Sequence, residues 1–159
     1  MAHIKPKTTV QMKMTAKGET HARSRIATRD VEGVIDEPLE RDGTNQGLTP
    51  TEGLMASLMG CTNVISKRIA RKMGVEMGEM RISLTASFDR RGAMLEEEVE
   101  TPFGEIAMDI EVATDATPEQ VDAIRRDLSR FCPVAKVIRA AGTVISENWS
   151  TAPLRKDTK

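Results

Sequence analysis

The chain has 159 residues, of which 39% are hydrophobic and 30% are charged, and its formal net charge is -1. This length suits one compact domain with a real core, and the near-balanced charge excludes a global basic field that would hold nucleic acid or an anionic membrane. We therefore expect a single domain over 1–159, with loose tails at about 1–7 and 152–159 and with neither nucleic acid nor a membrane as partner.

The first seven residues, Met1-Ala2-His3-Ile4-Lys5-Pro6-Lys7, have no apolar stretch behind their positive charges and do not resemble a secretory signal. No apolar run is long enough to span a bilayer. The expected location is the cytoplasm. Thiols are normally kept reduced there, and a single pair of cysteines is more often catalytic than a permanent structural disulfide.

Alternating residue types predict two strands near the start of the chain, at 8–14 and 21–28, with a turn at 17–18 between them. The pair 34–35 is predicted to extend the same sheet. The polar, glycine-containing stretch 39–48 is predicted to be a loop.

The best-marked helix follows this loop. Thr49 is the predicted N-cap, with Pro50 at the first helical position and Glu52 three residues past the cap, which together form a capping box. The helix is predicted to end at about Met73, with Gly74 as its C-cap.

The first half of this helix carries no charge between residues 53 and 65, so we expect it to be buried on all sides. A helix that is apolar all round needs more cover than one sheet gives in so small a chain, which favours a homodimer. One apolar stripe at helical spacing contains the first cysteine. Its members are Leu54, Leu58, Cys61, Ile65 and Ile69.

The second half of the chain alternates at 81–89, at 106–112 and at 143–150, and we predict a strand at each place. Two helices are predicted between the last two strands. The resulting order is two or three strands, a long helix, two strands, two helices and a strand, which indicates an α+β fold.

The first of these two helices opens with a second capping box at 117–120. It is predicted to stop at Cys132, because the residue before a proline disfavours helical conformation. A new helix then begins with Cys132 as N-cap and Pro133 at its first position, and Gly142 ends it. The predicted buried side of the first helix consists of Val121, Ile124, Leu128 and Phe131.

The residues alone leave the role of each cysteine open. Cys61 lies on an apolar stripe, where an inert buried cysteine is the ordinary finding, and the middle of a helix offers no dipole to stabilise a thiolate. Cys132 lies at a predicted helix N-terminus, where free backbone N–H groups do stabilise a thiolate. Local physics therefore predicts Cys132 as the more acidic thiol, although a structural cap is an equal alternative.

Other catalytic chemistry finds little support. There is no Cys-x-x-Cys, no His-Glu-x-x-His, and only two histidines, His3 and His21, so we expect no metal site. No phosphate loop, nucleophile elbow or dinucleotide fingerprint is present. Glu52 could serve as a catalytic carboxylate at the mouth of a pocket, but the capping box already explains it.

Two segments of the sequence resemble the OsmC/Ohr family. The first comprises Asp36-Glu37-Pro38, the run Gly43-Thr44-Asn45-Gln46-Gly47-Leu48-Thr49-Pro50-Thr51-Glu52, and the run from Leu54 through Gly60-Cys61-Thr62-Asn63-Val64-Ile65. The second is Arg130-Phe131-Cys132-Pro133-Val134-Ala135-Lys136-Val137, followed by Ile138 and Ala140. The two cysteine segments occur in the family's order and on the expected helices, and the match covers nearly the whole chain.

The resemblance implies antiparallel-rich sheets packed around long central helices in an intertwined homodimer. It also implies a chemistry, in which the first cysteine of the peroxidase members attacks a hydroperoxide and becomes a sulfenic acid. The second cysteine condenses with it to a disulfide. On this chain Cys61 would be the peroxidatic residue and Cys132 the resolving one. No bound cofactor is implied, and the expected reductant is an external dithiol of the dihydrolipoamide kind, free or carried on a lipoylated protein.

The sequence departs from the peroxidase members at two supporting positions. Those members hold an arginine against the first cysteine with a glutamate at the start of the cysteine helix. Counting back from Cys61, the glutamate position falls on Thr51, and Glu52 is one residue late. No motif fixes the arginine, which belongs to the N-terminal strands. Arg23 is the first choice, and its rivals are Arg25 and Arg29.

These departures place the chain nearer the broad OsmC-like branch and leave three hypotheses. The first is a thiol peroxidase that reduces organic hydroperoxides through Cys61 and Cys132. The second is an OsmC-like dimer without significant peroxidase activity that binds a small hydrophobic or electrophilic molecule at the cysteine pocket. The third is a structural dimer with two inert thiols.

Overall fold

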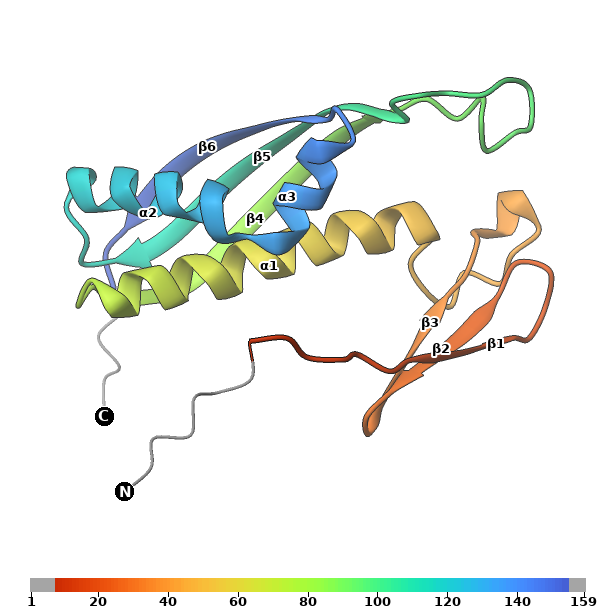
Figure 1. Cartoon of the computed structure of the whole chain (residues 1–159), viewed down its shortest axis with the longest axis horizontal. Helices are drawn as coiled ribbons and strands as arrows, with labels where there is room; N and C mark the ends of the chain where they lie inside the picture. The colour runs from red at the N-terminus through yellow and green to blue at the C-terminus, as the bar shows by residue number, and fades with distance from the viewer. Residues whose placement is uncertain (1–7, 155–159) are drawn as a thin grey trace. The chain divides into compact units, whose positions relative to one another are not determined.

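The computed structural model describes residues 8–154, so the predicted tail at 1–7 and residues 155–159 of the predicted tail at 152–159 lie outside the described residues. The chain divides into two compact units, with the boundary between Leu54 and Met55. The order of elements along the chain is the predicted one, and Figure 1 labels them.

The N-terminal unit contains an antiparallel sheet in the order β1 (Thr15–Gly18), β2 (Ser24–Thr28) and β3 (Val31–Ile35). The predicted third strand is confirmed, but the predicted strand at 8–14 is wrong because those residues precede β1. β2 ends in a turn at which Arg29 has a positive φ of 53°. Because of this turn, β2 does not continue opposite the residues that precede β1.

The first turn of this sheet also lies later than predicted. Lys17 and Gly18 both belong to β1, and the chain reverses at 20–22. The Thr20 hydroxyl accepts hydrogen bonds from the backbone N–H groups of Ala22 and Arg23, at 3.2 and 2.9 Å. A threonine that satisfies backbone donors in this way favours a turn over a strand, which explains the shift.

Helix α1 (Pro50–Lys72) starts and ends as predicted. The Thr49 backbone N–H donates to Glu52 Oε2 at 2.8 Å, and the Glu52 backbone N–H donates to Thr49 Oγ1 at 3.2 Å. This reciprocal pair is the predicted capping box. Gly74 has a positive φ of 73°, the conformation expected of a glycine just past a helix.

The burial of α1 differs from the prediction. Its buried residues within one chain are Leu58, Thr62, Ser66 and Ala70. Leu58 is the fully buried member of the predicted stripe, whereas its first member, Leu54, is 38% exposed. Val64 is 44% exposed, so the expectation that 53–65 is buried on all sides is wrong within one chain. A helix that packs on a single sheet leaves its far side uncovered.

The second unit is built on a sheet in the order β4 (Met77–Phe88), β5 (Phe103–Thr114) and β6 (Val144–Ala152). β4 and β5 are antiparallel, whereas β5 and β6 are parallel. A parallel pair needs a crossover, and helices α2 (Pro118–Phe131) and α3 (Pro133–Ala140) supply it. The helices of this unit lie on the same face of the sheet (Figure 1). The three predicted strands are confirmed, each somewhat longer than expected.

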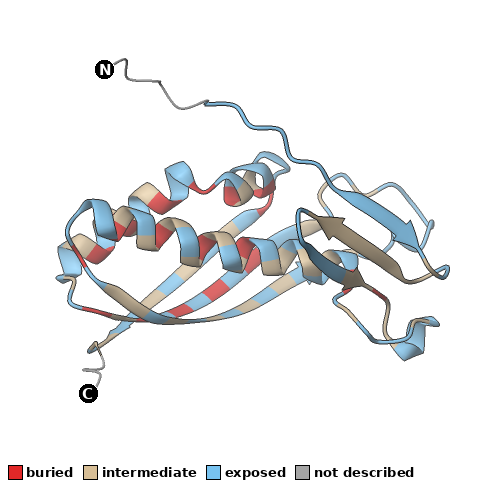
Figure 2. Ribbon diagram, turned by 90° about the horizontal axis from the view of Figure 1, so that it is seen from below, coloured by how far each residue is buried: buried red, intermediate tan, exposed pale blue. Residues whose placement is uncertain are grey.

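The core lies between the central strand and these helices. Ile106, Met108, Ile110 and Val112 alternate along β5 and are at most 2% exposed. Figure 2 shows buried residues alternating with exposed ones along the central strand of the sheet. The intervening residues of β5, such as Asp109 and Glu111, are exposed on the other face. One face is therefore apolar and the other polar, as an antiparallel-rich sheet covered on one side requires.

One predicted core residue is exposed. Val121, Ile124 and Leu128 are buried as expected, but Phe131 is 57% exposed. The chain leaves helical conformation at Cys132, which has φ -69° and ψ 110°, and Cys132 takes the next buried position instead. The prediction for Phe131 is wrong because the next buried position lies four residues after Leu128, at Cys132, and not three residues after it.

These elements confirm the predicted α+β class. Within residues 8–154, no helix is both long and apolar enough to cross a membrane. The homodimer stays a prediction.

The capping box of α2 yields a test of stability. Thr117 Oγ1 accepts from the Gln120 backbone N–H at 3.3 Å, and Gln120 Oε1 accepts from the Thr117 backbone N–H at 2.8 Å. We expect Thr117→Ala to lower the free energy of unfolding by about 1 kcal/mol, measured by urea unfolding. Thr117→Ser keeps the acceptor and serves as the control. An alanine variant as stable as the original protein would contradict the prediction.

Candidate functional site

The two cysteines meet in the core of the second unit, although 71 positions separate them along the chain. Cys61 lies in the middle of α1 and is half-buried. Cys132 lies between α2 and α3 and is 0% exposed. Their sulfur atoms are 2.7 Å apart. Both are free cysteines, so the pair is a dithiol in direct contact.

The local sequence fixes the position of Cys132. Its backbone N–H donates to the Leu128 carbonyl at 2.9 Å and so closes the last turn of α2. Pro133 then begins α3, and Cys132 Sγ accepts from the Ala135 backbone N–H at 3.4 Å as the N-cap of that helix. The sulfur is thus held by α3 on one side and contacts α1 on the other.

Burial sets the acidity of Cys132. Burial first, and then the neighbouring Cys61 thiol, raise the pKa of the Cys132 thiol to about 11. The backbone N–H of Ala135 acts the other way and is outweighed. The prediction that the helix N-terminus makes Cys132 the more acidic thiol is therefore wrong, since desolvation disfavours a thiolate more than the helix favours it.

The core around the two cysteines is apolar. Cys61 and Cys132 belong to the same hydrophobic cluster as Leu58, Leu128 and Ala135. Further apolar side chains pack against this cluster from α1 and α3, namely Met55, Ile65, Ile69 and Val134. A molecule that reached Cys61 from its exposed side would therefore meet hydrophobic side chains.

The two predicted supporting residues both belong to the N-terminal unit. Arg23 Nε is 3.0 Å from Glu19 Oε2, and its Nη1 donates to Thr44 Oγ1 at 3.0 Å. The rival Arg25 shares the same glutamate, with Nε 2.8 Å from Glu19 Oε1. Glu52 is engaged in the capping box of α1. The roles of Arg23 and Glu52 in catalysis stay predictions.

A buried carboxylate escaped the sequence-based search. Asp36 follows β3 and is 0% exposed. It accepts from the Thr44 hydroxyl at 2.5 Å and from the backbone N–H groups of Glu37, Thr44 and Gln46. Burial acts to raise the pKa of Asp36, but these hydrogen bonds together hold that pKa below its usual value. The signal was present, because an aspartate at the end of a strand before a glycine-containing loop commonly binds the loop's backbone.

The loop that Asp36 holds has no room for a side chain at either of its two glycines. A Cβ at Gly43 would lie 1.8 Å from the Glu37 carbonyl oxygen, and one at Gly47 would lie 2.2 Å from the Val34 carbonyl oxygen. The stretch predicted to be a loop is therefore a closely packed one, with a short 3-10 turn at Leu39–Arg41. It positions Thr44 against both Asp36 and Arg23.

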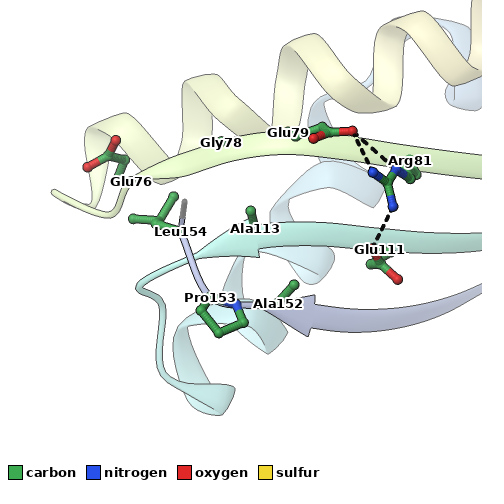
Figure 3. Close-up of a pocket in the computed structure, with 9 residues that line it drawn as sticks. All are labelled: Glu76, Gly78, Glu79, Arg81, Glu111, Ala113, Ala152, Pro153 and Leu154. Carbon is green, nitrogen blue, oxygen red and sulfur yellow. Dashed lines mark hydrogen bonds and ion pairs between the residues drawn. The ribbon is translucent and has the colours of Figure 1, made fainter. Parts of the chain in front are cut away.

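A cavity of about 300 Å³ lies elsewhere in the second unit, at one end of its sheet. Figure 3 shows Arg81 between Glu79 and Glu111, with Arg81 nitrogens 3.0 Å from a Glu79 oxygen and 3.5 Å from a Glu111 oxygen. The cavity lining carries three carboxylates, of Glu76, Glu79 and Glu111, and one arginine, and neither cysteine lines it. It therefore offers no nucleophile.

Within the part of the chain that the structure describes, no three histidine, cysteine, aspartate or glutamate side chains gather closely enough to hold a metal ion. The arrangement that carries chemistry is the dithiol itself. Two free cysteines in contact, one buried and one half-buried, form an arrangement from which thiol–disulfide chemistry can proceed.

Comparison with known proteins assigns the family. The family model for OsmC-like proteins matches residues 43–148, more than half of the chain, and includes both cysteines. The chain therefore belongs to the OsmC-like family, as the resemblance predicted. No curated protein sequence matches the chain.

Solved structures share the fold at low sequence identity. An OsmC-like protein from Mycoplasma pneumoniae matches with a TM-score of 0.75 and 14% identity, over 90% of this chain and 98% of that one. An organic hydroperoxide resistance protein from Elizabethkingia anophelis matches with a TM-score of 0.66 and 16% identity, over 92% and 99%. The organic hydroperoxide resistance protein OhrB of Bacillus subtilis matches at 0.58 and 20%, over 89% and 98%.

The raised pKa of Cys132 yields a pH prediction. The thiol stays neutral in the folded protein up to about pH 11, whereas its ordinary pKa is 9.0. The stability from this neutral thiol is complete below pH 9 and is lost as the pH rises to 11. In that window the free energy of unfolding should fall by up to about 1.4 kcal/mol per pH unit more than in Cys132→Ala, measured by urea unfolding. Parallel pH profiles of the two proteins would contradict it.

Proposed function

We propose that this protein is a thiol-dependent peroxidase that reduces organic hydroperoxides with Cys61 and Cys132. The observation that carries the proposal is the 2.7 Å contact between the two sulfur atoms. A sulfenic acid formed on one cysteine would have a thiol already beside it. Rapid condensation to a disulfide protects a sulfenic acid from further oxidation.

The difference in exposure assigns the two roles. Cys61 is half-buried, so a peroxide can reach its sulfur, whereas Cys132 is 0% exposed. Burial keeps Cys132 protonated, since it raises the pKa of that thiol to about 11, and a thiol is a poor nucleophile. Cys61 is therefore the peroxidatic residue and Cys132 the resolving residue, in agreement with the family order.

The proposed cycle balances with an external dithiol. The thiolate of Cys61 attacks the outer oxygen of the hydroperoxide, the O–O bond breaks, and the alcohol leaves after taking one proton. Cys132 then attacks the sulfur of the Cys61 sulfenic acid, a disulfide forms, and water leaves. A dithiol of the dihydrolipoamide kind, free or on a lipoylated protein, returns both cysteines to thiols and is itself oxidised to a disulfide.

The apolar surroundings support an organic substrate. Met55, Ile65 and Val134 pack around the cluster that contains both cysteines, and apolar side chains bind the alkyl or aryl part of a hydroperoxide better than they bind hydrogen peroxide. The names of two structural neighbours, organic hydroperoxide resistance proteins, point the same way.

We also propose that the protein acts as a cytoplasmic homodimer. The exposed apolar residues of α1, Leu54 and Val64, are 38% and 44% exposed in one chain. They lie on the helix half that carries no charge. A second copy that covered this surface would remove it from water, and such burial drives the association of homodimers.

One observation favours a second candidate function, in which the dimer binds a small hydrophobic or electrophilic molecule at Cys61 without turnover. Thr51 stands where the peroxidase members have a glutamate, and its hydroxyl lies 3.2 Å from Thr49 Oγ1. A threonine cannot hold an arginine by an ion pair. The mass experiment below separates the two candidates.

Peroxide turnover tests the assignment of the cysteines. With cumene hydroperoxide and dihydrolipoamide, we expect the original protein to consume peroxide and Cys61→Ser to be inactive, because the attacking sulfur is lost. Without the dithiol, Cys132→Ser should complete one reaction and stop at a sulfenic acid. Intact mass should show a loss of two hydrogens in the oxidised original protein and a gain of one oxygen in Cys132→Ser. Turnover by Cys61→Ser equal to that of the original protein would refute the peroxidase proposal.

The predicted activating arginine has its own test. We propose that the Arg23 guanidinium stabilises the thiolate of Cys61, so Arg23→Ala should slow the reaction with peroxide by about tenfold or more, the loss expected for one charge-assisted hydrogen bond. Arg81→Ala, which removes an exposed arginine from the polar sheet face, is the charge-matched control. If Arg25→Ala shows the larger loss, Arg25 is the activating residue and the assignment of Arg23 fails.

A further inference from the structure

We propose that the groove between α2 and β6 binds a small organic anion, a molecule that carries a phosphate or carboxylate group on an apolar or aromatic body. Two adjoining cavities of the second unit form this groove, with volumes of about 400 and 310 Å³. Cavities of this size commonly hold small ligands. The site goes beyond the proposed peroxidase function, because neither cysteine lines it.

The two cavities belong to one groove, because Asp122 and Arg125 of α2 line both of them. β6 is an edge strand of its sheet, and α2 lies beside it (Figure 1). Arg125 Nη2 donates to the backbone carbonyl oxygen of Glu147 at 3.4 Å. This hydrogen bond joins the helix to the strand where the cavities adjoin.

The larger cavity has more cationic than anionic side chains. Its lining contains three arginines and two carboxylates, namely Arg125, Arg126, Arg139, Asp122 and Glu147. A guanidinium group has five N–H donors and no acceptor, and its planar fork matches two oxygens of a carboxylate or a phosphate. The excess of donors over acceptors therefore suits an oxyanion.

The carboxylates of this cavity leave guanidinium donors without partners. Glu147 accepts from Trp149 Nε1 at 3.0 Å, and its other oxygen lies 3.5 Å from Arg139 Nη2. Among residues 8–154, the buried Arg139 Nη1 has no hydrogen-bond partner. Arg126 is exposed, and it forms no ion pair within the same described range. Arg126 is therefore the arginine most available to a ligand from solvent.

The smaller cavity offers an aromatic and apolar surface. Its lining includes the indole ring of Trp149 and the apolar side chains of Ala116, Pro118 and Val121. The hydrogen bond from Trp149 Nε1 to Glu147 orients the ring. An indole ring beside aliphatic side chains binds apolar and aromatic groups. A ligand with its oxyanion at the arginines and its body beside Trp149 would occupy both cavities.

The ordinary alternative is that these arginines form only a solvated face of α2, and a matched control distinguishes the two. Arg130 also belongs to α2 and, like Arg125, pairs with an aspartate three residues before it. The nitrogen–oxygen distances of these pairs are 3.1 Å for Arg130 and 3.3 Å for Arg125. Arg130 lines neither cavity, so its replacement removes the same charge from the same helix outside the groove.

Tryptophan fluorescence measures binding at the groove, because Trp149 is the single tryptophan of the chain and lines the smaller cavity. The probes are phenyl phosphate, phenylacetate and benzyl alcohol, of which the last has an aromatic ring but no charge. We expect at least one of the two anions to change the emission saturably and to bind about tenfold more tightly than benzyl alcohol, the gain expected from one hydrogen bond to a charged group. The tighter anion identifies the oxyanion that the groove prefers.

Substitutions on α2 then locate the anion. Arg126→Ala should weaken binding of the preferred anion about tenfold or more, for the same reason, whereas Arg130→Ala should leave it within about twofold. All titrations use one ionic strength, because salt screens the general attraction of anions. Both arginines are exposed, and alanine is the strongest helix former, so both variants should fold. The proposal is overturned if neither anion gives a saturable change, if benzyl alcohol binds as tightly as both anions, or if the two variants weaken binding equally.

Discussion

The packing of α1 and α3 against the same face of one sheet is the constraint on which the site depends. Leu58 of α1, Ile110 of β5 and Ile138 of α3 belong to one buried cluster, and this cluster fixes the separation of the two helices. This packing brings Cys61 and Cys132 into contact, and no covalent bond joins them. A substitution that removes volume from this cluster would therefore disturb the contact between the two sulfur atoms before it unfolded the protein, because protein interiors transmit small displacements.

Features with local causes could be predicted from the sequence. Both capping boxes, at Thr49 and Thr117, and the helix boundary at Cys132 follow from residues within four positions of each other, and the structure confirms all three. The strand at 8–14 and the burial of Phe131 could not be predicted in this way. A strand needs a partner opposite it, and the turn after β2 removes that partner; the burial of a helical residue depends on where the helix stops.

The candidate site likewise has features that follow from nearby residues and features that depend on distant elements of the fold. The order of the two cysteine segments allowed the family to be expected, but no local rule gives the distance between sulfurs so far apart in sequence. The acidity of Cys132 was mispredicted because the helix N-terminus is visible in the sequence, whereas the desolvation that outweighs it arises from burial by other elements. Asp36 was passed over for the related reason that its hydrogen-bond donors only converge once the loop is closed.

The sulfur that begins α3 is also the sulfur that would enter the disulfide. In the reduced protein, Cys132 Sγ accepts the Ala135 N–H and so satisfies one of the free donors at the start of that helix. Formation of a bond to Cys61 draws this atom toward α1 and changes how it can accept. Oxidation of the pair would therefore change how the first turn of α3 is capped.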